Sequence, residues 1–351
     1  MRLFPFWSPF RMFKPITAAI VAICLWAPPI HAAETDHAAL REDSLQVLEA
    51  QFGAFRTAAG QLSEASQAHC AGEKDDASYE EAFRATWLAW APLDAYQFGP
   101  VEQNAAVLTV AFWPDKKDFV GRGLKSLLAH PEDSLSMPET IAAQSAAVQG
   151  LPAIERLVFT EMAACPAIVG ISANIEYTAI ALYDGWFAEY GFADLARSAG
   201  PENPFFATDA EFTKLLYTAI DFELTRIADT RLGRPLNTYD KPMPRRAEAW
   251  RSGLSLQIID AQLAGIQLLL RDGFGNNLFS PSKSWVDGAI DDTRARIDVI
   301  GAPLDQAVAD PLQRARVEAL QTRILYLQQQ FAEDVGPELG VDTGFSAADG
   351  D

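Results

Sequence analysis

Apolar residues recur at helical spacing over long stretches of this sequence, and this periodicity limits the possible folds more than any other feature. One stripe between residues 165 and 190 consists of Ile168, Ile171, Ile175, Ala179, Leu182 and Trp186. Such a stripe is typical of a long, well-buried helix. Phe83, Trp87 and Trp90 repeat at spacings of four and three and predict another helix over 79–90. Because strand-like alternation is nearly absent, the sequence predicts an all-α fold.

The same spacing predicts three further long helices, over 209–232, 245–271 and 304–331, with shorter helices between them. Segments rich in glycine, proline and asparagine at 235–244 and 273–281 are typical of the loops that connect bundle helices. The chain is therefore expected to alternate helices with compact connections.

A Gly-Pro-Glu-Asn-Pro run at 200–204 interrupts the helical pattern and is the best candidate for an internal boundary. With 351 residues, the chain is longer than one typical compact domain and can bury a sizeable core. We therefore expect either two packed helical halves, over 34–200 and 201–351, or one large helical unit.

The first 33 residues have the layout of a secretory signal peptide. Three basic residues precede an apolar run over 16–27, and small residues follow before Glu34. The apolar run is too short to span a bilayer. Because the bulky Ile23 precedes Cys24, we expect no lipid attachment at that cysteine. The sequence thus predicts a signal peptide over 1–33 and an exported protein.

The charge balance excludes several classes of partner. There are 28 Lys and Arg residues against 47 Asp and Glu residues, giving a formal net charge of -19. Such a field repels phosphate backbones, so nucleic acid is not an expected partner. No long uncharged apolar stretch stands out beyond the signal sequence, so we do not expect an integral membrane protein.

Two cysteines remain once the signal sequence is removed, Cys70 and Cys165. An even pair in an exported protein favours a disulfide. Two unpaired buried thiols are the alternative. No third thiol or neighbouring histidine cluster supports metal binding by this pair.

Charged residues also occur on apolar helix faces. Glu223 shares a face with Phe212 and Leu216, and Arg226 follows nearby. Burial of a lone carboxylate is unfavourable, so this pair either lines a ligand site between helices or forms an ion pair that braces them.

A second polar group is expected near the start of the helix predicted over 245–271. Glu248 and Ser252 fall on one side there, and Arg251 flanks them. This polar group either faces another element packed against the helix or marks the solvated end of the helix.

The segment from Gly150 to Leu157 has the features of a helix start. Gly150 ends the preceding turn, Pro152 suits a first helical turn, and Glu155 complements the helix dipole. Glu155 could also serve as a metal ligand or general base, although no histidine stands beside it. Standard zinc, haem, phosphate-loop and serine hydrolase motifs are absent from the sequence.

Four short stretches form an ordered set of motifs. They are Phe112-Trp113-Pro114-Asp115-Lys116, Gly150-Leu151-Pro152-Ala153-Ile154-Glu155, the segment from Arg245 through Trp250-Arg251-Ser252, and the tail Gly344-Phe345-Ser346-Ala347-Ala348-Asp349-Gly350-Asp351. In this order they resemble the imelysin-like family of exported bacterial proteins, over nearly all of the mature chain. The resemblance implies a pair of helical bundles with a functional cleft near their junction, a periplasmic location and an association with iron uptake.

One position departs from the family pattern. Some members are described as metallopeptidases with a Gly-x-His-x-x-Glu signature, of which this chain keeps Gly150 and Glu155. Pro152 stands at the histidine position, and proline offers no nitrogen to a metal. The resemblance therefore implies a branch with Gly-Leu-Pro-Ala-x-Glu in place of the metal motif, which argues against an enzyme.

Three functions follow as hypotheses. The first is a periplasmic, non-enzymatic binding protein of iron uptake that holds a ligand, or iron bound through oxygens, in the cleft. Its candidate residues are Glu155, Arg156, Glu223, Arg226, Glu248, Arg251 and Ser252. The second is a metallopeptidase that recruits ligands such as His69 or His130. The third is an interaction module for a periplasmic or outer-membrane iron-uptake protein, using the Trp113 loop or the tail Asp349-Gly350-Asp351.

Overall fold

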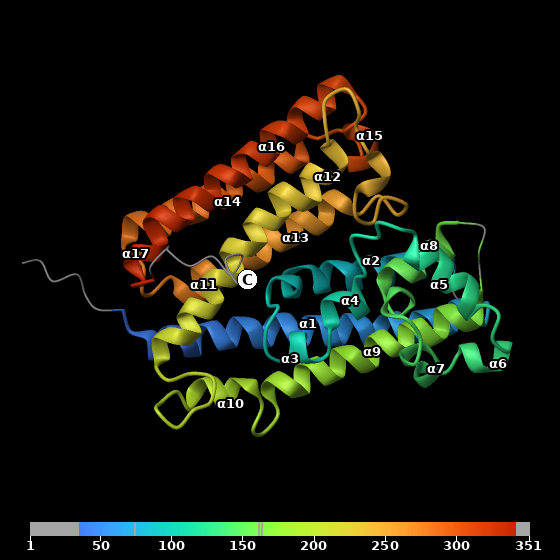
Figure 1. Ribbon diagram of the computed structural model, residues 1–351, viewed down its shortest axis with the longest axis horizontal. Coiled ribbons are helices and arrows are strands. Elements are labelled where there is room, and N and C mark those ends of the chain that lie inside the picture. The colour runs from blue at the N-terminus through green and yellow to red at the C-terminus, as the bar shows by residue number, and fades with distance from the viewer. Residues whose placement is uncertain (1–34, 74, 161, 163, 342–351) are drawn as a thin grey trace, which may run out of the picture. The chain divides into compact units, whose positions relative to one another are not determined.

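The computed structural model describes residues 35–73, 75–160, 162 and 164–341 (Figure 1). The predicted signal peptide over 1–33 and the tail with Asp349, Gly350 and Asp351 lie outside the described residues. The described residues from Thr35 to Val341 form one compact unit. Within the described ranges the β pairing consists of one isolated bridge between Thr238 and Lys241, so the predicted all-α fold is confirmed.

Helices follow one another along the whole described chain. The first part contains α1 His37–Cys70, α2 Asp76–Trp90, η1 Ala91–Ala95, α3 Pro100–Gln103, α4 Ala106–Val110, α5 Phe119–Leu127, α6 Glu132–Leu135, α7 Pro138–Ala142, η2 Ala146–Val148, α8 Leu151–Val158, α9 Cys165–Phe187 and α10 Phe192–Arg197. The second part contains α11 Asp209–Arg226, η3 Ile227–Leu232, α12 Gly233–Leu236, η4 Pro244–Arg246, α13 Ser255–Leu268, η5 Leu269–Phe274, α14 Ser280–Asp298, α15 Leu304–Ala307, α16 Pro311–Gln330, η6 Phe331–Val335 and α17 Gly336–Glu338.

Four of the five predicted long helices are present. A π-helical turn ends one of them, and Pro311 divides another into two helices. The predicted 79–90 and 165–190 helices are α2 and α9. The helix predicted over 209–232 is α11 continued by the π-helical turn η3. The segment 304–331 is divided into α15 and α16, because Pro311 begins a new helix whose first turn is capped by the Asp310 side chain.

The prediction of a helix over 245–271 is wrong near its start, at residues 247–254. Residues 247–254 form turns, and α13 begins only at Ser255. The backbone explains the difference, because Ala249 has φ of 49° and Gly253 has φ of 72°. These left-handed conformations cannot continue a right-handed helix.

The long helix α1 lies at the centre of the packing. It contacts α9 along its length and also packs against α2, α11 and η5, so it joins elements from both parts of the chain (Figure 1). Phe52, Phe55 and Leu62 on α1 are completely buried. Its first turn is capped by the Asp36 carboxylate, which accepts a hydrogen bond from the Ala39 amide at 3.0 Å.

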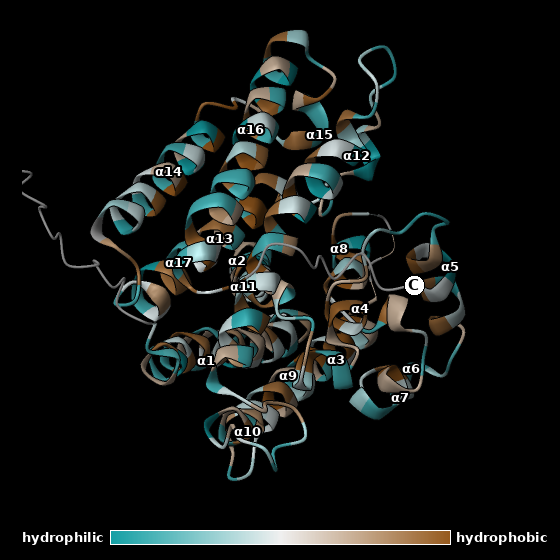
Figure 2. Cartoon of the chain, turned by 60° about the vertical axis from the view of Figure 1, so that its left-hand side comes forward, coloured by the Kyte–Doolittle hydropathy of each residue, from teal (hydrophilic) through white to brown (hydrophobic). Residues whose placement is uncertain are grey.

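Helices α11, α13, α14 and α16 form the bundle of the second part. Both α14 and α16 carry hydrophilic and hydrophobic residues in Figure 2, because one face of each packs and the other meets solvent. On α16 the packed face includes Val317, Leu320 and Ile324. The 310 turn η1 packs against α13 and thereby connects this bundle to the first part.

By length and composition, Cys165–Arg197 is the one candidate membrane-crossing segment among the described residues. Half (50%) of its most apolar window is buried inside the protein. The apolar character of α9 is therefore explained by its packing against α1.

The predicted disulfide between Cys70 and Cys165 is confirmed. It joins the last residue of α1 to the first residue of α9, with 5.5 Å between the two Cα atoms. Replacing both cysteines with alanine is expected to lower the free energy of unfolding by about 2 to 4 kcal/mol, because the unfolded chain loses a cross-link across a long loop. Urea denaturation of the oxidised proteins measures this difference, and an unchanged midpoint would contradict it.

Candidate functional site

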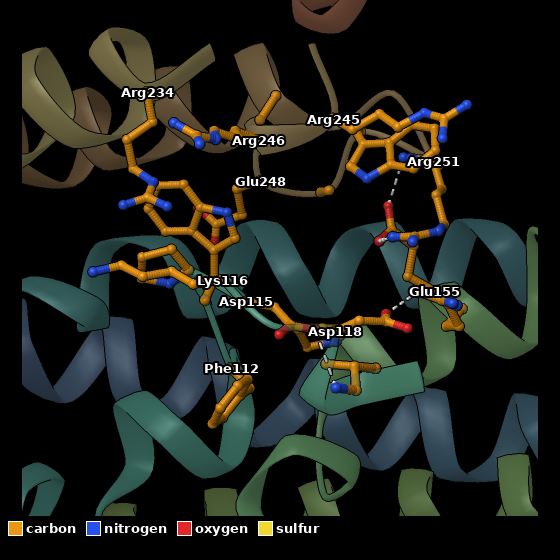
Figure 3. A pocket seen from close by; sticks show the side chains of 18 of the residues that line it. Phe112, Asp115, Lys116, Asp118, Glu155, Arg234, Arg245, Arg246, Glu248 and Arg251 are labelled. Carbon is orange, nitrogen blue, oxygen red and sulfur yellow. Dashed lines mark hydrogen bonds and ion pairs between the residues drawn. The ribbon is translucent and has the colours of Figure 1, made fainter. Parts of the chain in front are cut away.

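A cavity of about 590 Å³ opens where the two parts of the chain meet (Figure 3). One side is built by Trp87 of α2, the loop before α5, and the α8 residues. The other side is built by α12, η4 and the turn that follows η4. The lining residues are Trp87, Phe112, Trp113, Pro114, Asp115, Lys116, Asp118, Val120, Pro152, Glu155, Arg156, Arg234, Arg245, Arg246, Ala247, Glu248, Ala249, Trp250 and Arg251.

The loop before α5 is held in place by its own carboxylates. Asp115 accepts hydrogen bonds from the amides of Phe119 and Val120, at 2.7 and 3.0 Å, and so caps the first turn of α5. Asp118 accepts a hydrogen bond from the Arg156 guanidinium at 2.7 Å, which ties the loop to α8. Both carboxylates are therefore engaged in shaping the cavity.

Gly150 is required by the close approach of two backbones at the start of α8. A Cβ atom there would lie 2.2 Å from the Val110 carbonyl oxygen and 2.3 Å from that of Thr109. Gly150→Ala is therefore expected to destabilise the protein by about 1 to 3 kcal/mol, because backbone atoms must shift. Gly288→Ala is the control, since a Cβ there meets open space. Thermal denaturation compares them, and equal midpoints would contradict the prediction.

Glu155 is buried, with 3% of its surface exposed. Its Oε1 accepts three hydrogen bonds, from the Arg251 amide at 3.0 Å and from the Ser252 amide and hydroxyl, both at 2.9 Å. The Arg251 guanidinium stands 3.7 Å from Oε2. Burial raises the pKa of Glu155, although the donors from Ser252 and the charge of Arg251 counteract the rise. Glu155 thus anchors the 249–252 turn to α8.

A network of five charged groups, four of them buried and Arg226 partly buried, lies beside the cavity. Asp94 accepts hydrogen bonds from Arg226 and Arg231. Arg231 also stands 3.1 Å from a Glu248 oxygen and 3.7 Å from a Glu223 oxygen. Arg226 lies 3.6 Å from the other Glu223 oxygen. The network therefore sets three carboxylates against two guanidinium groups.

Burial changes the acidity of two carboxylates in this network. Burial raises the pKa of Glu223, against the opposing effect of Arg226 and Arg231. Burial likewise raises the pKa of Glu248 to about 7, against the charge of Arg231. Glu248 also lines the cavity, so it connects the network to the ligand space.

A pH dependence of stability follows from Glu248. Between its ordinary pKa of 4.5 and the raised value of about 7, the folded protein binds more protons than the unfolded chain. The free energy of unfolding is therefore expected to fall as pH rises through this window, by on the order of 3 kcal/mol, and to level above it. Urea denaturation between pH 4.5 and 8 measures the slope. Glu248→Gln should make the slope shallower, and the remaining slope would come from Glu155 and Glu223, whose pKa values are also raised by burial. An equal slope in both proteins would contradict this prediction.

The residues proposed from the sequence fall into two neighbouring places. Glu155, Arg156, Glu248 and Arg251 line the cavity, as do Trp113, Pro114, Asp115 and Pro152 from the motifs. Glu223 and Arg226 belong to the buried network and do not line the cavity. Ser252 contacts the cavity only through Glu155. Sequence analysis missed Asp94, Arg231 and Arg234. It also did not single out Arg246, although the basic pair at 245–246 lies within a motif.

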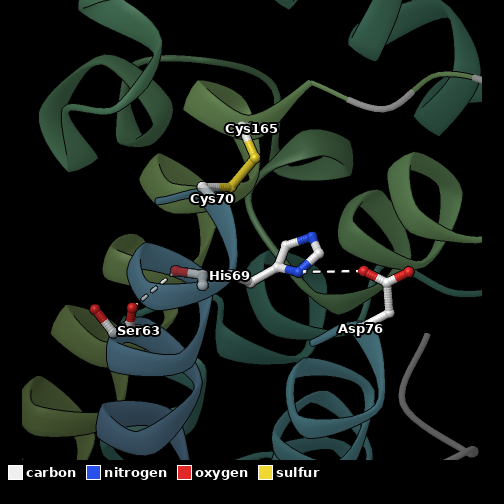
Figure 4. The surroundings of a disulfide bond; sticks show 6 residues. Ser63, His69, Cys70, Asp76 and Cys165 are labelled. Atoms are coloured by element: carbon white, nitrogen blue, oxygen red, sulfur yellow. Dashed lines mark hydrogen bonds and ion pairs between the residues drawn. A yellow bond between two sulfur atoms is a disulfide. The ribbon is translucent and has the colours of Figure 1, made fainter. Parts of the chain in front are cut away.

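The three described histidines, His37, His69 and His130, lie apart from the cavity lining. His69 sits near the disulfide, where it stacks on Tyr79 and lies 3.4 Å from the Asp76 carboxylate (Figure 4). His37 shares a hydrogen bond with Thr213, and His130 is exposed. Among the residues that the structure describes, no group of three or more His, Cys, Asp or Glu side chains could hold a metal ion.

With the geometry in place, comparison with known proteins gives the family. The imelysin family model, described as a peptidase family, matches residues 48–331. The chain belongs to the imelysin family. No curated protein matches it.

Two solved structures share the imelysin fold of this chain. An imelysin-like protein from Psychrobacter arcticum 273-4 has a TM-score of 0.73 at 19% identity, and the match covers 89% of this chain and 99% of that one. A putative iron-regulated protein A precursor from Parabacteroides distasonis ATCC 8503 has a TM-score of 0.65 at 15% identity, covering 84% and 95%. The expected imelysin-like arrangement of helices is thereby confirmed.

Proposed function

We propose that this imelysin-family protein is an exported, non-enzymatic binding protein of iron acquisition that holds its ligand in the cavity beside Glu155. The observation that carries the proposal is the state of Glu155, whose Oε1 already accepts three hydrogen bonds from Arg251 and Ser252. A carboxylate used in this way shapes the binding site, because three donors hold one of its oxygens and the Arg251 guanidinium lies 3.7 Å from the other.

Two further observations support this role. Pro152 lines the cavity at the position of the family's peptidase histidine, so this position of the motif offers no metal ligand. The link to iron comes from the family and from the similar Parabacteroides protein, whose name describes it as iron-regulated. Export is proposed from the signal-like sequence over 1–33.

Binding and hydrolysis are separated by two assays on the mature protein beginning at Glu34. The first is a calorimetric titration with iron as the free ion and as soluble ferric complexes. The second is digestion of unfolded casein with and without a chelator. The proposal expects saturable binding of an iron species and no chelator-sensitive cleavage. Cleavage that the chelator abolishes would favour a metallopeptidase, and binding of no iron species would contradict the proposed role in iron acquisition.

A further inference from the structure

The cavity presents more positive than negative groups to its interior, in a chain with a net charge of -19. Its basic lining residues are Lys116, Arg156, Arg234, Arg245, Arg246 and Arg251, and its acidic lining residues are Asp115, Asp118, Glu155 and Glu248. Figure 3 shows Arg234, Arg246, Arg245 and Arg251 along one side of the cavity, above the acidic side chains. The local charge is thus opposite to that of the protein.

The acidic groups are already engaged by the protein. Asp115 caps α5, and Asp118 pairs with Arg156. Glu155 accepts the donors of the 249–252 turn, and Glu248 is 4% exposed and faces Arg231. A cation entering the cavity would have to compete with these contacts, which strongly disfavours a bare metal ion as the ligand.

Several of the basic groups have no such partner. Within the described ranges, no carboxylate oxygen lies within 4.0 Å of the nitrogen atoms of Lys116, Arg234, Arg245 or Arg246. Burial of Arg234 and repulsion from the neighbouring Arg246 lower the pKa of Arg234, because both disfavour its cationic form. An anion placed between these side chains would relieve that repulsion.

The rings of Trp113 and Trp250 stack against guanidinium groups of the cavity and restrict their orientation. The Arg234 guanidinium carbon lies 5.8 Å from the centre of the Trp113 ring. Those of Arg245 and Arg251 lie 5.6 and 4.4 Å from the centre of the Trp250 ring. Such stacking restricts a planar guanidinium while leaving its N–H edge available, and that edge matches a carboxylate in a two-pronged contact.

We infer that the ligand of this cavity is an anionic, carboxylate-rich chelate of ferric iron, recognised through its negative oxygen groups by Arg234, Arg245 and Arg246. This inference rests on the proposed function, because iron enters only through that proposal. The protein would then contact the chelator's oxygens and leave the coordination of the metal to the chelator. The cavity of about 590 Å³ is large enough for a small-molecule complex.

The test uses three iron probes with the mature chain: ferric citrate, which is anionic; the ferric complex of desferrioxamine B, which is cationic; and free ferrous ion. Citrate alone and inorganic phosphate are the metal-free arms. Calorimetry and quenching of tryptophan fluorescence report binding. We expect ferric citrate to bind at least about 10-fold more tightly than any other probe, and its affinity to weaken as salt is added.

The double variant Arg245→Gln/Arg246→Gln removes two of the proposed contacts. It should weaken ferric citrate binding by about 100-fold, because each charge-assisted contact contributes strongly to affinity. Arg271→Gln/Arg296→Gln is the matched control, since it removes the same charge from exposed side chains outside the cavity lining. Circular dichroism and denaturation confirm that both variants are folded.

The outcomes separate this inference from the proposed function. Tight binding of free ferrous ion or of the cationic complex, without ferric citrate binding, would overturn the anionic ligand and leave the iron-binding role standing. Equal loss of binding in the cavity variant and the control would also overturn the inference. Binding of citrate or phosphate with no preference for the ferric complex would contradict both the chelate and the role in iron acquisition.

Discussion

Replacing Arg231 with methionine is expected to lower the free energy of unfolding by about 3 to 5 kcal/mol. Arg231 is 2% exposed and lies between Asp94, Glu223 and Glu248. Without it, three buried carboxylates share the single guanidinium of Arg226. Breaking a buried ion pair on one side is strongly destabilising because the remaining charges stay buried without compensation. Urea denaturation at pH 8 measures the change.

Two controls identify the cause of that loss. Glu248→Gln leaves two carboxylates facing two guanidinium groups, so its stability at pH 8 should equal or exceed that of the unmodified protein. Arg296→Met removes an exposed arginine that pairs with Asp292, and it should change stability by less than about 0.5 kcal/mol. If Arg231→Met were as mild as Arg296→Met, the five-charge network would not have the structural role assigned to it.

Replacing Glu155 with alanine is expected to cost about 3 to 6 kcal/mol of folding stability and to abolish ligand binding. The substitution leaves the amides of Arg251 and Ser252 and the Ser252 hydroxyl without their acceptor. The 249–252 turn also carries Trp250 and Arg251 into the cavity wall, so its release disrupts the site. Thermal denaturation and calorimetric titration with ferric citrate measure the two effects.

Glu155→Gln distinguishes an anchoring role from metal coordination. Glutamine keeps a carbonyl oxygen in the position that accepts the three donors, so this variant should retain most of the stability and the binding. Ser252→Ala removes only the hydroxyl donor and should fall between the two. Equal damage from glutamine and alanine would mean that the negative charge of Glu155, and not its hydrogen bonds, is what the site requires.

The sequence was most informative where one physical effect dominates. The apolar stripe from Ile168 to Trp186 predicts α9 because a helix buried along α1 needs that spacing. The Cys70–Cys165 bridge follows from an even pair of cysteines beyond the predicted signal peptide. The motif residues Trp113 and Glu155 line one cavity, in keeping with a resemblance that spans most of the chain.

The sequence was less informative where distant contacts decide the structure. The 34-residue helix α1 was not singled out, because its packed face contains polar residues such as Arg41, Ser44 and Gln51 and so has no clean apolar stripe. The turn at 247–254 looks helical by spacing, but Glu155 on a different helix supplies the acceptor that holds it. Such a contact between residues 96 positions apart leaves no local pattern.

The buried network shows the same limit. Glu223 and Arg226 were recognised as a pair on one helix, and the pair is present at 3.6 Å. Asp94 and Glu248 come from separate segments, and only the folded chain brings them to Arg231. Periodicity along one helix cannot indicate which neighbouring helix supplies the partner charge.

The central claim is that Glu155 shapes an anion-binding cavity and is not a metal ligand. Its most direct test is a calorimetric titration of the mature protein and its Glu155→Gln variant, each with ferric citrate and with free ferrous ion. We expect both proteins to bind ferric citrate with similar affinity and neither protein to bind free ferrous ion. Binding of free ferrous ion by the unmodified protein, lost in Glu155→Gln, would contradict this claim.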